Sequence, residues 1–220
     1  MTSFATYDPQ RLLARRSIGQ QAWDLLGFPL RYVLFPDHWN QRLHLSSLEE
    51  ERLRAVLPSI HGRLLDVGAG TNTLVRTYRG PGVGVDVFDF GGGAQLVEDT
   101  RRLPFPDASF DTITYLACLN HIPYRAEALR EAHRLLRPGG TLLATMINRL
   151  LGKVGHAIWW YSEDKHRGML EGEVGGLDVD EMQRLLTGAG FQEVRFSRFG
   201  YGMNGLYRAT RPAAAAREAA

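Results

Sequence analysis

The sequence predicts an α/β fold with a seven-stranded, mostly parallel sheet and helices on both faces. From about residue 63 onwards, short apolar runs typical of buried strands alternate with stretches of helical periodicity, which is the pattern of a parallel sheet connected by helices. Near the end of the chain, two strand-like runs are separated only by residues 200–202. So short a connection joins antiparallel strands, and the sheet is therefore expected to end in an antiparallel hairpin.

Length and composition favour one domain. The 220 residues are 44% hydrophobic, which is enough for a substantial core, and we expect a single domain over residues 1–220. The lone cysteine, Cys118, excludes an intrachain disulfide bond. The chain has no start-of-chain signal and no run of eighteen apolar residues, so we expect a cytoplasmic protein without integral membrane contact. A net charge of +2 is too small to indicate a nucleic-acid partner.

The first sixty residues are predicted to form helices that precede the sheet. Ser47 and Glu50 have the spacing of a capping box for a helix that stops at Pro58. Upstream, residues 28–36 are apolar, aromatic and bracketed by prolines, so we expect a short helix or an extended segment laid across the domain.

Beyond the leading helices, strands and helices are expected to alternate. The predicted strands are residues 63–67, 82–86, 95–98, 110–115, 140–146, 191–198 and 203–210, and the predicted helices are about 72–79, 125–136 and 179–187. Pro138, Gly139 and Gly140 are predicted to end the middle helix and to turn the chain into the next strand. Residues 213–220 are predicted to be a frayed helical tail.

Glycines follow the first predicted strand in the run Leu64–Thr71. Gly68 and Gly70 allow a sharp turn that leaves bare backbone beside a ligand, and the amides that open the next helix can face an anionic group. The glycines alone also fit a tight turn with no ligand. Asp86 strengthens the ligand interpretation because it ends the next strand, twenty residues after Asp66, where an acidic side chain can accept two ribose hydroxyls.

A third acid, Asp99, follows the next predicted strand, and the three acids together resemble the cofactor site of class I S-adenosylmethionine (SAM)-dependent methyltransferases. Residues 103–111 and 135–142 resemble the small-molecule branch of that family, which includes ubiquinone and menaquinone methyltransferases. The resemblance covers about residues 60–146 and implies a Rossmann-like sheet. The implied parts of the domain are a helical lid over 1–60, a SAM-binding half over 61–146, a substrate-side half over 147–212 and a tail over 213–220.

The resemblance also implies SAM as the cofactor. The glycine-rich turn would receive the methionine part, the second acid the ribose, and the third acid the adenine; the residues concerned are Asp66, Gly68, Ala69, Gly70, Asp86, Val87, Asp99, Thr100 and Leu116. The chain departs from the family pattern at Asn72, where a glycine is usual, although asparagine tolerates left-handed backbone. It departs again at residues 91–93, where a short glycine run stands in place of a helix.

His121 is the candidate general base. It follows the fourth predicted strand, on the side where the resemblance places the methyl group of the cofactor. A histidine suits the removal of a proton from a hydroxyl or an acidic carbon near neutral pH. The alternative role for His121 is structural, as a side chain that orders its loop by bonding to backbone.

Aromatic residues outside the cofactor motifs indicate an acceptor pocket. All four tryptophans lie in the leading segment or after the fifth predicted strand, the regions that build the acceptor site in this architecture. We expect a pocket for a planar or lipophilic acceptor, lined by Tyr32, Trp39, His44, Trp160 and Tyr161. Alternatively, these rings anchor the lid to the sheet.

The function expected from these features is methyl transfer from SAM to oxygen, nitrogen or carbon of a small organic acceptor. One alternative is a SAM-binding protein that does not methylate, either a pericyclase-like catalyst or a regulatory binder. An RNA or protein methyltransferase is disfavoured because residues 119–122 lack a motif such as Asn-Pro-Pro-Tyr. No metal is expected, since none of the seven histidines joins a cysteine or an acid at ligand spacing.

Overall fold

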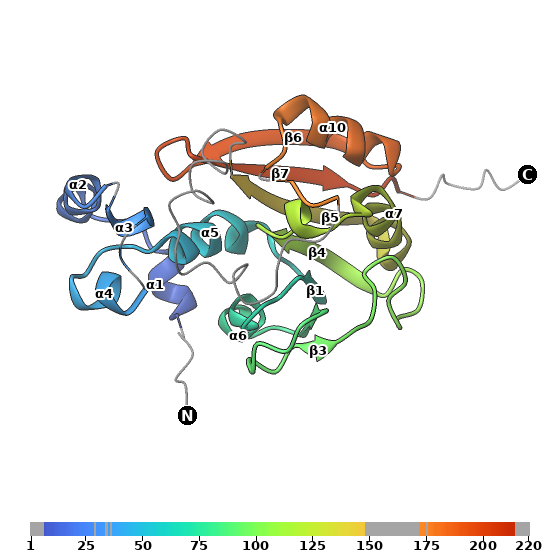
Figure 1. Ribbon diagram of the computed structural model, residues 1–220, viewed down its shortest axis with the longest axis horizontal. Helices are drawn as coiled ribbons and strands as arrows, with labels where there is room; N and C mark the ends of the chain where they lie inside the picture. Colours follow the sequence, from blue (N-terminus) through green and yellow to red (C-terminus); the bar gives the residue numbers. More distant parts are fainter. Residues whose placement is uncertain are drawn as a thin grey trace, which may run out of the picture.

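The computed structural model describes residues 7–28, 30–33, 35, 37–147, 172–174 and 176–213. Figure 1 shows a central sheet whose seven strands follow the order β3-β2-β1-β4-β5-β7-β6. The strands are β1 (Leu64–Val67), β2 (Gly82–Asp86), β3 (Gln95–Leu96), β4 (Phe110–Leu116), β5 (Leu136–Ile147), β6 (Gln192–Phe199) and β7 (Asn204–Thr210). The predicted seven-stranded sheet is confirmed.

Strand direction determines which loops share an edge of the sheet. β1 pairs in parallel with β2 and β4, β2 with β3, and β4 with β5. β7 is antiparallel to both β5 and β6, which confirms the predicted hairpin. β6 therefore runs in the direction of the parallel strands, and the turn from β6 to β7 lies at their carboxyl edge, where ligands of such sheets bind.

Helices cover both faces of the sheet, as predicted. They are α1 (Pro9–Leu13), α2 (Ile18–Leu26), α3 (Leu30–Val33), α4 (Asp37–Arg42), α5 (Leu48–Val56), α6 (Thr73–Tyr78), α7 (Arg125–Leu135) and α10 (Val179–Gly188), with the 3-10 turns η1 (Leu57–Ser59) and η2 (Leu119–His121). Successive strand residues point to opposite faces. Accordingly, Leu65 packs in a core cluster shared with α7 and α10, and its neighbour Leu64 in a second cluster shared with α1, α5 and α6.

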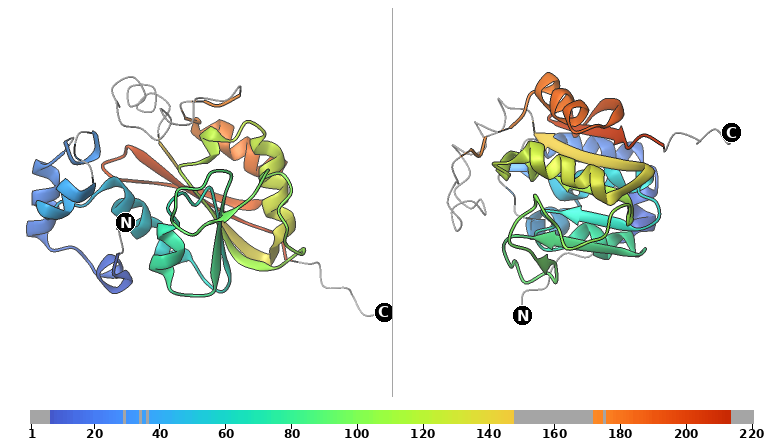
Figure 2. Two further views of the ribbon diagram at one scale, coloured as in Figure 1. Left: turned by 60° about the horizontal axis from the view of Figure 1, so that its bottom comes forward. Right: turned by 90° about the vertical axis from the view of Figure 1, so that its right-hand side faces the viewer.

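The N-terminal helices stand at the carboxyl edge of the sheet. Figures 1 and 2 show α2, α3 and α4 at one end of the molecule, beyond α5. The ring of Tyr201, in the turn from β6 to β7, lies 5.4 Å from that of Phe28 and 6.4 Å from that of Tyr32. These contacts join the segment that precedes the sheet to the edge where a ligand is expected.

Ser47 caps α5, as the predicted capping box requires. Its hydroxyl oxygen accepts a bond from the Glu50 amide at 3.1 Å. The second half of the box is replaced, because the Glu50 carboxylate accepts bonds from Arg54 one turn further along the helix, at 3.2 and 3.0 Å.

The expectation that Pro138, Gly139 and Gly140 end the helix before β5 is wrong. α7 already ends at Leu135, and β5 begins at the next residue and includes all three. The pairing with β4 jumps from Leu136 to Thr141, so the intervening residues form a bulge. Backbone bonds of 2.9 Å between this bulge and Arg211 keep it in the sheet.

Candidate cofactor site and general base

The glycine-rich turn after β1 is fastened to the end of β2. Gly68 and Gly70 adopt left-handed backbone, with φ of 71° and 51°. The amides of Gly68 and Ala69 donate to the carbonyl of Val85, at 2.9 and 3.0 Å. The amide of Gly70 donates to a carboxylate oxygen of Asp86 at 2.8 Å. The turn therefore brings three of the predicted cofactor residues against a fourth, Asp86.

The space around the two glycines explains the residue type at each position. A Cβ on Gly68 would lie 2.6 Å from the Cβ of Cys118, so the loop after β4 leaves no room for a side chain. A Cβ on Gly70 would have no atom of the described chain within 4 Å. Bare backbone at Gly70 therefore borders open space, as a ligand that approaches the main chain requires.

Asn72 takes the left-handed conformation expected of it, with φ of 60°. Its side-chain amide donates to the carbonyl of Gly93 at 3.2 Å. Arg76 donates to the carbonyls of Thr71 and Gly92. The short glycine run after β2 thus packs directly on the glycine-rich turn, in the place where the family commonly has a helix.

Asp66 is buried beneath this turn, with 2% of its surface exposed. Its carboxyl group accepts a bond from the Thr114 hydroxyl at 2.6 Å. Burial raises the pKa of Asp66 to about 7, the negative charge of Asp86 acts in the same direction, and the bond from Thr114 opposes both. Asp66 is therefore an acid that changes charge near neutral pH.

Cys118 lies beside the two acids, but its chemistry is not that of a nucleophile. Its Sγ donates to the carbonyl of Val67 at 3.0 Å. Burial raises the pKa of its thiol well above the usual range, and the carboxyl groups of Asp66 and Asp86 raise it further. The thiol stays protonated at physiological pH.

Asp86 is held in one orientation at the end of β2. Its side chain is buried, and the oxygen not used by the glycine-rich turn accepts a bond from the Phe88 amide at 3.1 Å. A carboxylate oxygen can accept more than one bond, so both oxygens retain capacity for further donors. Val87 and Phe88, each 46% exposed, lie beside it and present apolar surface to the open side.

Asp99, the third acid predicted to bind the cofactor, is bonded to Arg101. The two carboxylate oxygens of Asp99 accept bonds from the amide and the Nε of Arg101, at 2.8 and 2.5 Å. Thr100 is buried next to it, and Leu116 ends β4 at the same edge. Each oxygen of Asp99 already accepts one bond from Arg101. An adenine amino group could therefore bind only to the remaining lone pairs of this carboxylate.

Both ring nitrogens of His121 are engaged. Nδ1 lies 3.2 Å from a carboxylate oxygen of Glu173, whose side chain is fully buried, and Nε2 lies 2.9 Å from the side-chain amide of Asn120. These partners fit the neutral tautomer in which Nδ1–H donates to Glu173 and Nε2 accepts from Asn120. Glu173 could not be identified from the sequence alone, because it lies 52 positions from His121 and no local motif marks it.

Tyr32, a predicted acceptor residue, is buried at the carboxyl edge. Its hydroxyl lies 3.2 Å from the position of a Cβ on Gly200, and the Nδ2 of Asn204 lies 3.7 Å from the same position. The Tyr32 hydroxyl and both polar side-chain atoms of Asn204 make no hydrogen bond within the described part of the chain. Asn204 is a second residue that sequence reasoning missed, since nothing in its neighbourhood distinguishes it from an ordinary strand end.

Two of the other predicted acceptor residues, Trp39 and His44, lie in the described part of the chain. Trp39 is 49% exposed on α4 and stacks on Phe35. His44 is exposed, with a left-handed φ of 54°. Trp160 and Tyr161 lie outside the described residues, as do residues 214–220 of the predicted tail. The roles of these four side chains in acceptor binding stay predictions.

Two further features concern only the described ranges. No group of three or more histidine, cysteine or acidic side chains there could hold a metal ion. No helix in those ranges combines the length and the apolar character needed to cross a membrane.

Comparison with known proteins agrees with this geometry. A family model described as a methyltransferase domain matches residues 65–144. The ubiquinone/menaquinone biosynthesis C-methyltransferase UbiE of Azotobacter vinelandii is 31% identical over 137 residues, which are 55% of this chain and 54% of the relative. UbiE of Ectopseudomonas mendocina is 28% identical over 187 residues, which are 68% of this chain and 73% of the relative. This chain thus spans about half the length of the first relative and nearly three quarters of the second.

The same architecture occurs in a solved structure. A SAM-dependent methyltransferase from Thermotoga maritima superposes with a TM-score of 0.62 and 21% sequence identity, over 80% of this chain and 94% of that one. The chain is similar in sequence and in fold to the class I SAM-dependent methyltransferases. Its resemblance to the ubiquinone and menaquinone branch of that family is confirmed by the UbiE relatives.

The residues at this edge of the sheet fit SAM as a ligand. The main chain at Gly70 is open, as an amino-acid tail that approaches the backbone requires. Asp86 presents a fixed carboxylate with lone pairs left for hydroxyl donors, and Asp66 adds a buried acid directly below. The Asn72 carboxamide oxygen is buried and makes no hydrogen bond to the described residues, which leaves one further acceptor beside the turn.

Proposed function

We propose that this methyltransferase transfers the methyl group of SAM to a small aromatic or lipophilic acceptor. The observation that carries the proposal is the fixed Asp86 carboxylate, bonded to Gly70 and Phe88 at the end of β2 and placed next to the buried Asp66. Such an arrangement offers acceptors for a ribose and open backbone for an amino-acid tail within one edge of the sheet.

The residues proposed to hold SAM divide by the part of the molecule they contact. The turn after β1 receives the methionine tail, and Asp66 faces its ammonium group directly or through a water. Asp86 accepts the ribose hydroxyls. Adenine lies against the half-exposed apolar surface beyond β2 and near the segment that follows β3. The residues are Val87, Asp99, Thr100 and Leu116, together with Gly68, Ala69 and Gly70 in the turn.

SAM supplies a methyl group that is already activated by a sulfonium centre, so the chain has to align the acceptor, exclude water and take up one proton. His121 is the proposed base. Its Nδ1–H is oriented by Glu173, which directs the Nε2 lone pair away from that carboxylate. An acceptor hydroxyl would take the place of the Asn120 amide at Nε2 and pass its proton to that nitrogen. The acceptor would gain the methyl group as the bond between that group and sulfur breaks, and the demethylated cofactor would leave.

The acceptor is proposed to lie between the N-terminal helices and the turn from β6 to β7. The Tyr32 hydroxyl and the Asn204 carboxamide, which have no hydrogen-bond partner among the described residues, offer a donor and an acceptor there, and buried polar groups gain from a partner. The two relatives are named as C-methyltransferases of ubiquinone and menaquinone biosynthesis, which favours a nucleophilic ring carbon. In this proposal residues 1–60 form the lid of a single domain.

The test uses the purified full chain and SAM labelled in its methyl group. A reduced quinone that lacks one ring methyl, a catechol and an aromatic amine are supplied separately. The proposal predicts the demethylated cofactor and a labelled product with the quinol or the catechol. Binding of SAM with no label transferred to any acceptor would contradict the proposal and support a SAM-binding protein that does not methylate.

A further inference from the structure

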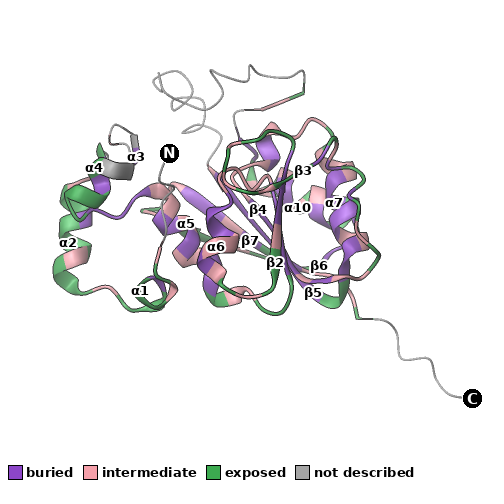
Figure 3. Ribbon diagram, turned by 90° about the horizontal axis from the view of Figure 1, so that it is seen from below, coloured by how far each residue is buried: buried purple, intermediate pink, exposed green. Residues whose placement is uncertain are grey.

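Helix α2 is amphipathic, but it turns a polar side chain towards the protein and its apolar side towards the outside. Its only buried residue is Asp24. Ile18, Leu25 and Leu26 are 86%, 56% and 77% exposed, and Ala22 between them is also exposed. Residues spaced by four, seven and eight positions share one side of a helix, so these four side chains form a continuous apolar stripe that faces away from the protein. Figure 3 shows α2 largely exposed at the end of the molecule.

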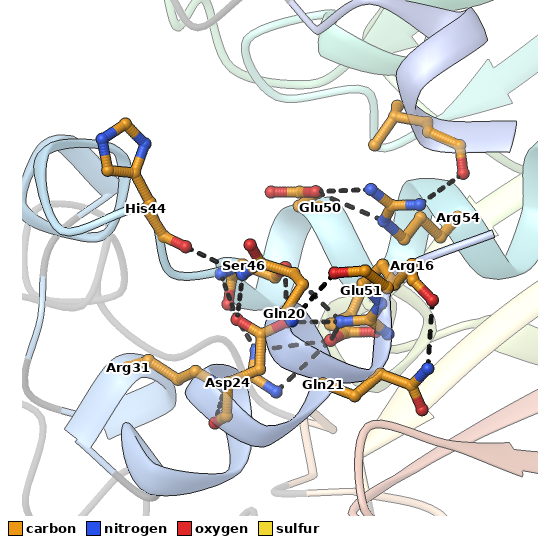
Figure 4. A network of polar contacts seen from close by, with 12 residues as sticks. Arg16, Gln20, Gln21, Asp24, Arg31, His44, Ser46, Glu50, Glu51 and Arg54 are labelled. Carbon is orange, nitrogen blue, oxygen red and sulfur yellow. Dashed lines mark hydrogen bonds and ion pairs between the residues drawn. The ribbon is translucent and has the colours of Figure 1, made fainter. Parts of the chain in front are cut away.

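A buried polar network fixes this orientation, as Figure 4 shows. The Asp24 carboxylate accepts bonds from the amide and the hydroxyl of Ser46, both at 2.9 Å, and from Arg16 at 2.8 Å. Glu51, on α5, binds Arg16 at 2.6 Å and Arg31 at 3.3 Å. A rotation of α2 that buried its apolar stripe would separate these buried charges, which is strongly unfavourable. The stripe is therefore held outward by the fold.

Most of the large hydrophobic side chains described as exposed belong to the same N-terminal segment as the stripe. Eight of the thirteen exposed large hydrophobic side chains in the described part of the chain lie between residues 13 and 43. They are Leu13, Ile18, Trp23, Leu25, Leu26, Leu30, Trp39 and Leu43, and together they are called the α2 face below. Exposed apolar side chains concentrated in one part of the chain in this way indicate an interaction site.

The charges around the α2 face indicate what it contacts. Among the side chains described within residues 7–47, the exposed charged ones are Arg11, Arg15, Arg42 and Asp8, three positive against one negative. A second copy of the chain placed by two-fold symmetry on this face would bring the arginines of the two copies together. A negatively charged lipid surface instead pairs with them and receives the leucines and the tryptophan rings at headgroup depth.

We propose that the α2 face binds the surface of an anionic lipid bilayer, with α2 lying in the plane of the headgroups. The contact is peripheral and adds to the methyltransferase site without depending on it. It places the carboxyl edge of the sheet, which the N-terminal helices contact through Tyr201, next to the membrane surface.

The experiment is co-sedimentation of the full chain with vesicles of phosphatidylglycerol and phosphatidylcholine in equal parts, and with pure phosphatidylcholine vesicles. The stripe variant is Leu25→Asp with Leu26→Asp, and the matched control is Leu96→Asp, which changes a leucine that is 62% exposed on β3. A charge variant, Arg11→Gln with Arg15→Gln, tests the electrostatic part. Thermal unfolding of each variant shows that it folds, and light scattering gives its oligomeric state.

The proposal predicts that the chain and the Leu96 variant sediment with the mixed vesicles at low salt. The stripe variant should lose about tenfold or more of its partition coefficient, and the arginine variant should lose most of its preference for anionic lipid. Equal sedimentation of the stripe variant and the chain would overturn the proposal. So would a chain that stays in the supernatant, or one that forms a dimer which the stripe variant dissociates.

Discussion

At the scale of single residues, the site combines a carboxylate fixed by backbone amides with an acid that is close to half protonated at neutral pH. Asp86 and Asp66 lie on neighbouring strands, and the charge of Asp86 contributes, after burial, to the raised pKa of Asp66. A negative charge on Asp66 destabilises the folded chain when no cation is bound, because the group is buried and lies near Asp86. A bound cation would stabilise that charge. The α-ammonium group of SAM is such a cation, so stability and cofactor binding are expected to respond oppositely to changes at Asp66.

Asp66→Asn tests this coupling through pH. In the unfolded chain Asp66 ionises near its ordinary pKa of 3.8, whereas in the folded chain burial keeps it protonated up to about pH 7. Its contribution to stability is therefore present below pH 4 and lost as the pH rises towards 7. The variant should lose this decline and gain about 2–4 kcal/mol over the wild type at pH 8. Urea unfolding at pH 4 and pH 8 without cofactor measures it, and parallel pH dependence in the two proteins would contradict the expectation.

His121→Gln tests the proposed base. With a hydroxyl or acidic-carbon acceptor we expect kcat to fall by about 10²–10⁴-fold while the Kd for SAM stays the same. Glu173→Gln should lower kcat less, because Glu173 only orients the ring. His61→Gln, at an exposed histidine before β1, is the control. Full turnover of the His121 variant across pH 6–9 would assign the side chain to ordering its loop.

Tyr32→Phe tests whether Tyr32 binds the acceptor or only anchors the N-terminal helices to the sheet. The Tyr32 hydroxyl makes no hydrogen bond in the described chain, so its removal should leave the free energy of unfolding unchanged or slightly raised. If the hydroxyl binds the acceptor, the KM for the acceptor rises by up to about tenfold. An unchanged KM in steady-state assays would leave the ring with only its packing role against Arg31 and Tyr201.

At the scale of elements, the N-terminal helices are joined to the body of the protein by charges more than by apolar packing. Arg31 is fully buried and donates to the Asp24 carbonyl at 2.8 Å, to the Ser46 carbonyl and to Glu51. Its guanidinium lies 4.1 Å from the Tyr32 ring centroid and 5.2 Å from that of Tyr201. One side chain thus connects α2, α3, α5 and the turn from β6 to β7.

Arg31→Met should therefore destabilise the chain by about 3–5 kcal/mol, because it leaves Glu51 and two carbonyls buried without this donor. Arg130→Met is the control, since Arg130 is 60% exposed and its pair with Glu127 contributes less than about 1 kcal/mol. Chemical denaturation gives both free energies of unfolding. Similar values for the two variants would show that the network does not hold the helices in place.

At the scale of the whole molecule, most of the sheet could be predicted because alternating apolar runs and turn residues mark its strands. The antiparallel end followed from the short connection between residues 199 and 204, and the glycine-rich turn from its composition. The start of β5 could not be predicted. Its glycines resemble a helix stop, and only the pairing with Arg211, far along the chain, keeps them in the strand.

The partners of the site residues were equally beyond sequence reasoning. The exception is the bond from Gly70 to Asp86, which joins two residues that the sequence already assigned to one site. Glu173 and Asn204 reach the site only through the folding of distant segments, so no local pattern distinguishes them. The reversed amphipathicity of α2 was also hidden, because periodicity shows that a helix has an apolar side but does not show which way that side faces.

The central claim is that the carboxyl edge of β1 and β2 binds SAM through Asp86 and the glycine-rich turn. Isothermal titration calorimetry of SAM into the full chain, the Asp86→Ala variant and the Asp89→Ala control tests it most directly; Asp89 is an exposed aspartate that also accepts a backbone bond, from Gly91 at 2.7 Å. We predict saturable binding to the chain and to the control, and a loss of about 3 kcal/mol, roughly a hundredfold in Kd, in the Asp86 variant. Absence of binding to the unmodified chain at millimolar SAM, or equal Kd values for all three proteins, would contradict it.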